Sequence, residues 1–164
     1  MFGKLFKKKE EVTDIVLAAP VTGEVVALED VQDPVFSQKM MGDGIAVQPS
    51  SGEVVAPVNG KIVQVFPTKH AVGILADNGA EILIHIGLET VGLNSEGFTA
   101  HVGEGDMVKK GEKLISFDLE VVREKAKDTI TPMIVTNTDD MSKITVLDKK
   151  EVTAGQDEIL TVKK

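Results

Sequence analysis

Cysteine, tryptophan and tyrosine are absent from this chain of 164 residues, and phenylalanine supplies all of its aromatic side chains. Without cysteine the chain forms no disulfide, which fits the reducing environment of the cytoplasm. Because aromatic residues make up only 4% and hydrophobic residues 42% of the chain, the core must be built from Val, Ile, Leu and Met. A mass of 17.6 kDa corresponds to one ordinary domain with a substantial core.

Long apolar runs and an excess of positive charge are also lacking. No run approaches the roughly 20 residues of a membrane-spanning helix. The basic start, residues 1–9 (MFGKLFKKK), has no room for the hydrophobic region of a signal peptide. The net charge of −8 argues against a nucleic-acid partner and favours docking onto basic protein surfaces. We therefore expect a cytoplasmic monomer that binds other proteins.

Most of the chain consists of short β-branched segments bounded by Gly, Pro, Asn or Ser. The expected strands are residues 15–17, 23–28, 44–47, 52–56, 60–65, 68–75, 82–88, 113–117, 133–136 and 159–162. Turn signals at this spacing are typical of a compact antiparallel sandwich or barrel, so the predicted class is all-β with one or two short helices. The best helix candidate is residues 119–127, with Asp118 as N-cap and Lys125 and Lys127 near its C-terminal end.

An internal repeat accompanies this strand pattern. Residues 19–26 (APVTGEVV) recur 37 residues later as residues 56–63 (APVNGKIV). A looser pair joins residues 108–115 to residues 152–159, where a valine, two spacers and a glycine precede an apolar strand. The alternative is that Pro-Val-x-Gly is common turn chemistry. We favour a duplicated β unit.

A titratable ring lies inside the apolar run of residues 82–88 (ILIHIGL). If these residues form a strand, alternation places Ile82, Ile84, Ile86 and Leu88 on one face, and His85 on the other with Glu81 and Leu83. Asn-Gly is a strong hairpin signal, because a type I′ turn needs positive φ at both central residues. A two-residue turn at Asn78 and Gly79 sets Val72 opposite His85 and His70 on the diagonal, about 7–8 Å away at the backbone. The predicted register thus brings two of the three histidines together.

The histidine pair suits two kinds of chemistry. Two imidazoles can bind a metal but need further ligands, and Thr68 is a poor one. Alternatively, one imidazole nitrogen is a nucleophile that forms a phosphoramidate reversibly, while the second ring, a hydroxyl and backbone donors stabilise the phosphoryl oxygens. The residues alone leave metal binding and phosphoryl carriage both open, beside the plainer reading of His85 as a half-buried, hydrogen-bonded strand residue.

Residues 81–91 (EILIHIGLETV) closely resemble the phosphohistidine signature of the glucose-type enzyme IIA of the bacterial phosphoenolpyruvate-dependent sugar phosphotransferase system. The supporting motifs occur in the expected order: Ala19-Pro20 with Gly23, residues 41–46, residues 56–60, His70-Ala71, Gly97-Phe98, and Asp118-Leu119 leading into Thr131-Pro132. The resemblance covers roughly residues 14 to 163. It implies an antiparallel β-sandwich of the duplicated hybrid-motif kind.

The same resemblance implies roles for the site residues. His85 would accept a phosphoryl group on Nε2 from the histidine-containing phosphocarrier protein and pass it to the cysteine of a sugar-specific enzyme IIB, the partner of the membrane component IIC. His70 would donate a hydrogen bond to that group, and Thr68 would supply a hydroxyl. No cofactor is required. For Nε2 to be nucleophilic, the proton must be held on Nδ1, and the carbonyl of Gly87 is the natural acceptor.

Partner docking is expected around the histidines. Val35, Phe36, Met40 and Met41 cluster in one short segment, and exposed Phe and Met are adaptable contacts for several partners. Val91 and the acidic Asp33 and Glu89 would frame this patch and meet partner arginines. The alternative is that the apolar members belong to the core. Regulatory protein targets are a further class of partner that varies between bacterial groups.

Two rival functions have different requirements. A biotinyl or lipoyl carrier domain carries its modified lysine at a hairpin tip, where this chain has Asp77-Asn78-Gly79. A metal-binding protein would use His70 and His85, and zinc held by this pair would need a further ligand, such as a carboxylate from a bound partner.

Residues 1–13 are expected to be a flexible basic leader, followed by the enzyme IIA domain at residues 14–164. Phe2, Leu5 and Phe6 fall at helical spacing, beside Lys4, Lys7, Lys8 and Lys9. Near anionic lipid, each lysine is worth about 1 kcal/mol, so residues 1–10 predict a weak peripheral membrane contact. A merely solvated tail is the alternative.

Overall fold

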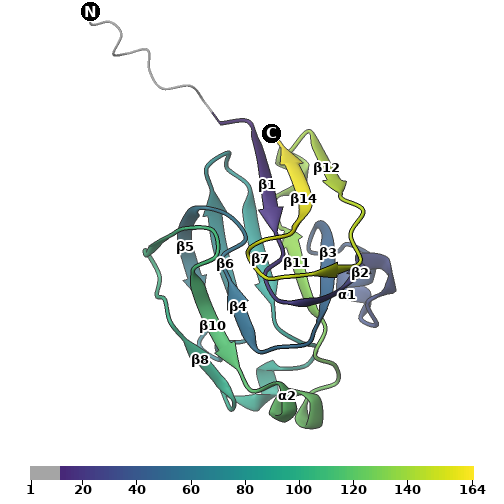
Figure 1. Cartoon of the computed structure of the whole chain (residues 1–164), viewed down its shortest axis with the longest axis vertical. Helices are drawn as coiled ribbons and strands as arrows, with labels where there is room; N and C mark the ends of the chain where they lie inside the picture. The colour runs from purple at the N-terminus through teal and green to yellow at the C-terminus, as the bar shows by residue number, and fades with distance from the viewer. Residues whose placement is uncertain (1–11) are drawn as a thin grey trace, which may run out of the picture.

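The computed structural model describes residues 12–164, and the structural statements below refer to this part of the chain. Antiparallel strands form most of it, as Figure 1 shows. The largest sheet has eight strands in the order β13-β2-β3-β11-β7-β6-β5-β9. Its members are β2 (Gly23–Ala27), β3 (Asp43–Pro49), β5 (Gly60–Val65), β6 (Ala71–Ala76), β7 (Glu81–His85), β9 (Met107–Val108), β11 (Thr131–Val135) and β13 (Glu151–Val152).

Two three-stranded sheets and a few short helices complete the fold (Figure 1). One sheet contains β1 (Asp14–Ala18), β14 (Glu158–Lys163) and β12 (Lys143–Val146), and the other contains β4 (Glu53–Val55), β10 (Lys113–Phe117) and β8 (Phe98–Ala100). The α-helices are α1 (Pro34–Ser37) and α2 (Leu119–Lys125), and single 3-10 turns cover Leu28–Asp30, Val91–Leu93 and Thr138–Asp140. Among residues 12–164, no helix combines the length and apolar character needed to cross a bilayer. The all-β prediction is confirmed.

The predicted duplication is present in the arrangement of the strands. The large sheet divides into β13-β2-β3-β11 and its mirror series β9-β5-β6-β7, which meet where β11 pairs with β7. The amide of Ala18 donates to the carbonyl of Pro57 at 2.9 Å, and the amide of Val55 donates to the carbonyl of Pro20 at 2.8 Å. Both residues of the second bond lie 37 positions from their counterparts, which is the offset of the sequence repeat.

The large sheet buries apolar side chains on both faces near its centre. Ile82 and Ile84 of β7 belong to the main core between the sheets. Between them, Leu83 points to the opposite face and joins a second buried cluster, formed by Leu28, Val31, Phe36, Ala46, Ala71, Leu83, Leu88, Ile130 and Ile134. We call this set the outer cluster. Because side chains alternate along a strand, His85 shares a face with Leu83 and lies at the edge of the outer cluster.

Three local predictions need correction. The predicted alternation is wrong at Leu88, which belongs to the outer cluster, because the strand ends at His85 and Gly87 adopts a φ of +77°. The predicted strand at residues 68–75 begins only at Ala71. The helix ends at Lys125 rather than Lys127, although its predicted N-cap is confirmed: the Asp118 carboxylate accepts hydrogen bonds from the amides of Glu120 and Val121.

The turn between β6 and β7 also differs from the prediction. The amide of Ala76 donates to Ala80 and that of Gly79 donates to Ala76, so the loop has three residues instead of two. Positive φ occurs at Gly79 (+92°) but not at Asn78, as in a three-residue hairpin loop that ends in a left-handed residue. The pairing therefore shifts by one, and Ala71 rather than Val72 lies opposite His85.

The leader lies almost wholly outside the described residues. Residues 1–11, which include all of its aromatic and lysine side chains, are not among them. The predicted membrane contact through residues 1–10 therefore stays a prediction.

Candidate functional site

His85 is the last residue of β7, and its ring is partly exposed. Its Nδ1 lies 2.9 Å from the carbonyl oxygen of Gly87. A carbonyl oxygen only accepts hydrogen bonds, so Nδ1 carries the proton of the neutral ring and Nε2 carries the lone pair. The prediction that Gly87 is the acceptor for Nδ1 is confirmed.

The carbonyl of Gly87 is held in place by its surroundings. A Cβ atom at this position would lie 2.6 Å from Cγ2 of Thr90 and 2.8 Å from the carbonyl oxygen of Asp128. With a φ of +77°, the position is closed to other residues on both steric and conformational grounds. The next residue, Leu88, donates from its amide to Asp128 at 2.9 Å and accepts from the amide of Lys127 at 3.1 Å. The loop after His85 is thus tied to the segment that follows α2.

His70 lies beside His85, as predicted, but the strand register that brings them together differs from the prediction. The centroids of the two rings are 4.9 Å apart. The register places Ala71 opposite His85, so continued alternation would turn His70 to the other face. His70 precedes the strand, however, and its carbonyl accepts from the amide of Ile86 at 2.7 Å. Its ring is buried, and its Nδ1 lies 2.5 Å from Oγ1 of Thr68.

Burial favours the neutral form of both imidazoles. For His70, burial and, to a smaller extent, the neighbouring His85 ring together lower the pKa from 6.5 to about 4. Burial also lowers the pKa of His85, although its hydrogen bond to Gly87 and the charge of Asp33 act in the opposite direction. A neutral ring keeps a lone pair on one nitrogen, which a nucleophile requires.

Two phenylalanine rings contact the histidines. The centroid of Phe36 lies 5.1 Å from that of His85, and the centroid of Phe66 lies 5.5 Å from that of His70. Phe36 is only 4% exposed and belongs to the outer cluster, so the expectation that it is an exposed contact is wrong. It is buried because α1 folds its apolar side onto the large sheet.

The other apolar residues predicted for docking lie on the surface, in and after α1 and directly after Thr90. Val35, Met40, Met41 and Val91 are exposed, by 38%, 68%, 38% and 57% respectively. Glu89 is exposed, and the half-exposed Asp33 caps α1 by accepting from the amide of Val35 at 3.0 Å. Their role in docking is a proposal that is taken up below.

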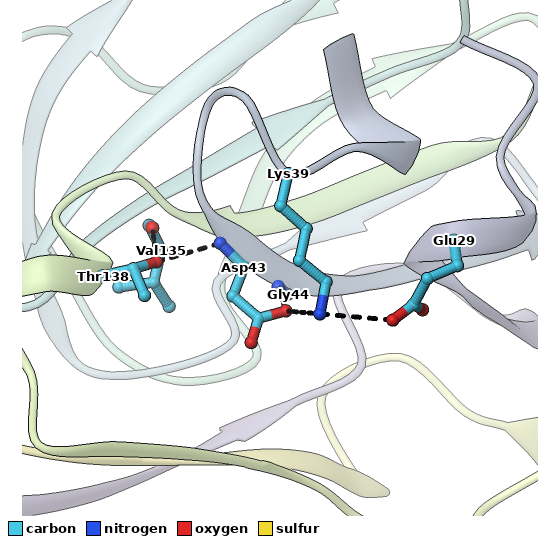
Figure 2. Close-up of polar contacts among 6 residues, drawn as sticks. All are labelled: Glu29, Lys39, Asp43, Gly44, Val135 and Thr138. Atoms are coloured by element: carbon cyan, nitrogen blue, oxygen red, sulfur yellow. Dashed lines mark hydrogen bonds and ion pairs between the residues drawn. The ribbon is translucent and has the colours of Figure 1, made fainter. Parts of the chain in front are cut away.

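An ion-pair bridge anchors the segment that carries Phe36. Nζ of Lys39 lies 3.2 Å from the carboxylate of Glu29 and 3.3 Å from that of Asp43, which begins β3 (Figure 2). The hydrogen bonds with these two carboxylates raise the pKa of Lys39. The amide of Asp43 donates to Thr138 Oγ1 at 2.9 Å, and that hydroxyl donates to the carbonyl of Val135 (Figure 2). The ion pairs and these hydrogen bonds therefore link the segment that carries Phe36 to Val135 at the end of β11.

The geometry gives little support to a metal-binding site or to a carrier domain with a modified lysine. Within residues 12–164, no three histidine or acidic side chains gather where they could hold a metal ion, so zinc at His70 and His85 would need a ligand from elsewhere. The hairpin tip contains no lysine, and the side chain of Asn78 points inward, donating to the carbonyls of Thr13 at 3.0 Å and Val162 at 3.2 Å. This tip is not built to present a swinging cofactor.

Fold and site together define a class of protein: a duplicated antiparallel β-sandwich built around a neutral imidazole whose Nε2 carries the lone pair. The comparisons agree with this class. Residues 15–141 match the family described as "phosphoenolpyruvate-dependent sugar phosphotransferase system, EIIA 1". The chain belongs to this family, and it is a phosphotransferase component that carries phosphoryl groups in sugar uptake.

Named relatives cover nearly the whole chain. It is 56% identical to the PTS system glucose-specific EIIA component of Oceanobacillus iheyensis over 163 residues, 99% of both chains. It is 55% identical to the protein of the same name from Bacillus cereus, over 99% of this chain and 98% of that one. The solved structure of the glucose permease IIA from Mycoplasma capricolum superposes with a TM-score of 0.86 at 38% identity, over 94% of this chain and 99% of that chain.

Sequence reasoning missed two residues near the site. Thr90, whose methyl group packs against Gly87, lies inside the signature motif, and this position in the motif is the signal that could have found it. Phe66 follows β5 and packs on His70, but no pattern in the sequence points to it.

Proposed function

We propose that this chain carries a phosphoryl group on Nε2 of His85. The observation that carries the proposal is the hydrogen bond from Nδ1 of His85 to Gly87, because it leaves the lone pair on Nε2. The ring stays neutral because burial lowers its pKa. A neutral imidazole attacks phosphorus, whereas an imidazolium cannot.

The group would come from the histidine-containing phosphocarrier protein. The lone pair of His85 Nε2 forms the new N–P bond, the donor's N–P bond breaks, and its electron pair returns to the donor imidazole. The proton stays on Nδ1, where the Gly87 carbonyl stabilises the positive charge of the phosphorylated ring. In the second transfer, the thiolate of an enzyme IIB cysteine attacks phosphorus and His85 leaves as a neutral ring.

His70 and Thr68 would stabilise the transferred group. A hydroxyl that donates to Nδ1 of His70 places the His70 proton on Nε2, which can then donate to a phosphoryl oxygen. With its pKa lowered to about 4, His70 stays a neutral donor and is not a general acid at pH 7. It would therefore support the group without competing for it.

The partners would dock on the surface formed by the segment around α1 and the loop that follows His85. Its apolar part consists of Val35, Met40, Met41 and Val91, which are exposed without being part of the core. Asp33 and Glu89 add negative charge, suited to basic side chains on a partner. Enzyme IIB of a sugar permease is the proposed acceptor, and a glucose-type IIB is the first to test, because the relatives are named glucose-specific. We place these reactions in the cytoplasm.

Incubation with phosphoenolpyruvate, enzyme I and the phosphocarrier, followed by intact mass measurement, tests the proposal. One acid-labile group of roughly 80 Da should appear, the mass of HPO₃ on an imidazole. His85→Ala should abolish the gain, whereas His101→Ala, which removes an exposed histidine just after β8, should retain it. Phosphorylation of the His85→Ala protein would contradict the assignment.

A further inference from the structure

A buried threonine, Thr90, packs against the loop that follows His85. Thr90 is fully buried, and its hydroxyl donates to the carbonyl of Ile86 at 2.7 Å. Ile86 stands between His85 and Gly87, so this bond closes residues 86–90 into a tight loop. The loop also contains Glu89 in the left-handed region, with a φ of +59°.

The hydroxyl of Thr90 does not cap the helical turn that begins after it, as a threonine at an N-cap position usually does. Thr90 is the N-cap of the 3-10 turn Val91–Leu93, yet its side chain makes no capping hydrogen bond. It is directed backward along the chain to Ile86 instead. A capping role is therefore not what the buried hydroxyl provides.

The methyl group of Thr90 limits the movement of Gly87. A Cβ built on Gly87 would lie 2.6 Å from Cγ2 of Thr90 and 2.8 Å from the carbonyl oxygen of Asp128, so both atoms pack closely against this glycine. With the amide of Leu88 bonded to Asp128 at 2.9 Å, the Gly87 peptide is held at both of its ends. Two contacts of the Thr90 side chain, its hydroxyl with Ile86 and its methyl group with Gly87, thus act together with Asp128 on the segment that carries the Gly87 carbonyl.

We propose that Thr90 is a positioning residue for the phosphoryl acceptor: it holds the Gly87 carbonyl against Nδ1 of His85 and so keeps the lone pair on Nε2. This inference rests on the proposed function of His85. An imidazole that loses a fixed acceptor at Nδ1 exchanges its proton between both nitrogens. Each molecule with the proton on Nε2 is unable to attack phosphorus, so loss of the Thr90 contacts lowers the reactive fraction.

The test compares three variants of buried threonines. Thr90→Val keeps the shape and removes the hydroxyl, whereas Thr90→Ser keeps the hydroxyl. Thr131→Val is the matched control, because Thr131 is also fully buried and its hydroxyl donates to a carbonyl, that of Thr129 at 3.1 Å. Nitrogen chemical shifts of the ¹⁵N-labelled His85 ring report which nitrogen carries the proton, and phosphorylation by the phosphocarrier gives the rate.

We expect the wild type and the Thr131→Val variant to hold the proton on Nδ1. Thr90→Val should gain the Nε2–H form and lose about 10–100-fold in phosphorylation rate, by analogy with the loss of an outer-shell hydrogen bond behind a metal-binding histidine. Thr90→Ser should restore both properties toward the wild type. If Thr90→Val does not fold, Thr90→Cys takes its place with the same expectation, because a thiol is a weaker donor.

A folded Thr90 variant without the hydroxyl that keeps the wild-type tautomer and rate would overturn the inference. An equal loss of rate in Thr131→Val would do so too, since the effect would then reflect stability alone. The tautomer is measured without phosphorylation, so failure of the wild type to be modified at His85 would overturn the proposed function separately.

Discussion

The rings of His70 and His85 lie edge to face, with their planes at 78°. The Nδ1 atom of each ring makes a hydrogen bond, that of His70 with the hydroxyl of Thr68 and that of His85 with the carbonyl of Gly87. With Thr68 donating to His70, one Nε2 atom carries a lone pair and the other carries a proton. In the proposed function both Nε2 atoms meet the phosphoryl group, one as the acceptor of phosphorus and the other as a donor to oxygen.

The first prediction separates the roles of these rings. His70→Gln should still gain one phosphoryl group on His85 but should pass it to enzyme IIB about 10²–10³-fold more slowly, the usual loss for one preorganised donor. Rapid-quench measurement of transfer to enzyme IIB gives the rate, and His101→Gln serves as the control. Unimpaired transfer by His70→Gln would reduce His70 to a structural neighbour.

The second prediction concerns stability at acid pH. The pKa of His70 is lowered from 6.5 to about 4 in the folded protein, so the unfolded chain binds the proton more tightly. The free energy of unfolding should therefore fall as pH decreases from about 6.5 to about 4, by at most roughly 1.4 kcal/mol per pH unit from this group. Urea denaturation across this range should show a shallower pH dependence for His70→Gln than for His101→Gln. Parallel curves would show that the His70 ring is not desolvated.

The third prediction distinguishes core from docking surface. Phe36→Ala should lower the free energy of unfolding by about 3–5 kcal/mol, because it leaves a cavity in the outer cluster. Its sequence neighbour Val35 is 38% exposed, so Val35→Ala should leave stability almost unchanged. Binding of the phosphocarrier, measured by calorimetry, should nevertheless weaken for Val35→Ala. Full affinity in that variant would remove Val35 from the docking surface.

The fourth prediction concerns zinc. Two imidazoles are fewer than the three protein ligands of a typical zinc site, and no acidic group joins them within residues 12–164. The isolated chain should therefore bind zinc weakly, and His70→Gln should weaken it further. A bound partner that supplies a carboxylate should strengthen it. Tight binding by the chain alone, seen by calorimetry, would point to a ligand outside the described residues.

The site could be predicted from sequence even though the register that led to it was wrong by one residue. Asn78-Gly79 suggested a two-residue turn, but the Asn78 amide is used to bind Thr13 and Val162, and the loop takes three residues. Such tertiary bonds leave no mark in a local motif. A shift of one residue should exchange the faces of a strand. His70 escapes this exchange only because it stands before β6 begins.

The burial of Phe36 could not be predicted for a similar reason. A helix of four residues is too short for a hydrophobic period, so α1 shows no apolar stripe that would assign its inner side. Phe36 packs on a sheet face in the outer cluster. That cluster forms only where β3, β7 and β11 lie side by side, so no single segment reveals it. Longer segments with clear alternation, such as β7, were assigned correctly up to His85.

The mirror order of the large sheet separates topology from chemistry. At its centre β7 (EILIH) and β11 (TPMIV) occupy equivalent places, yet only β7 ends in an imidazole and β11 contains no titratable side chain. The two halves of the sheet are thus alike in topology and different in chemistry: the half that contains β7 presents an ionisable ring, and the equivalent strand of the other half is wholly neutral.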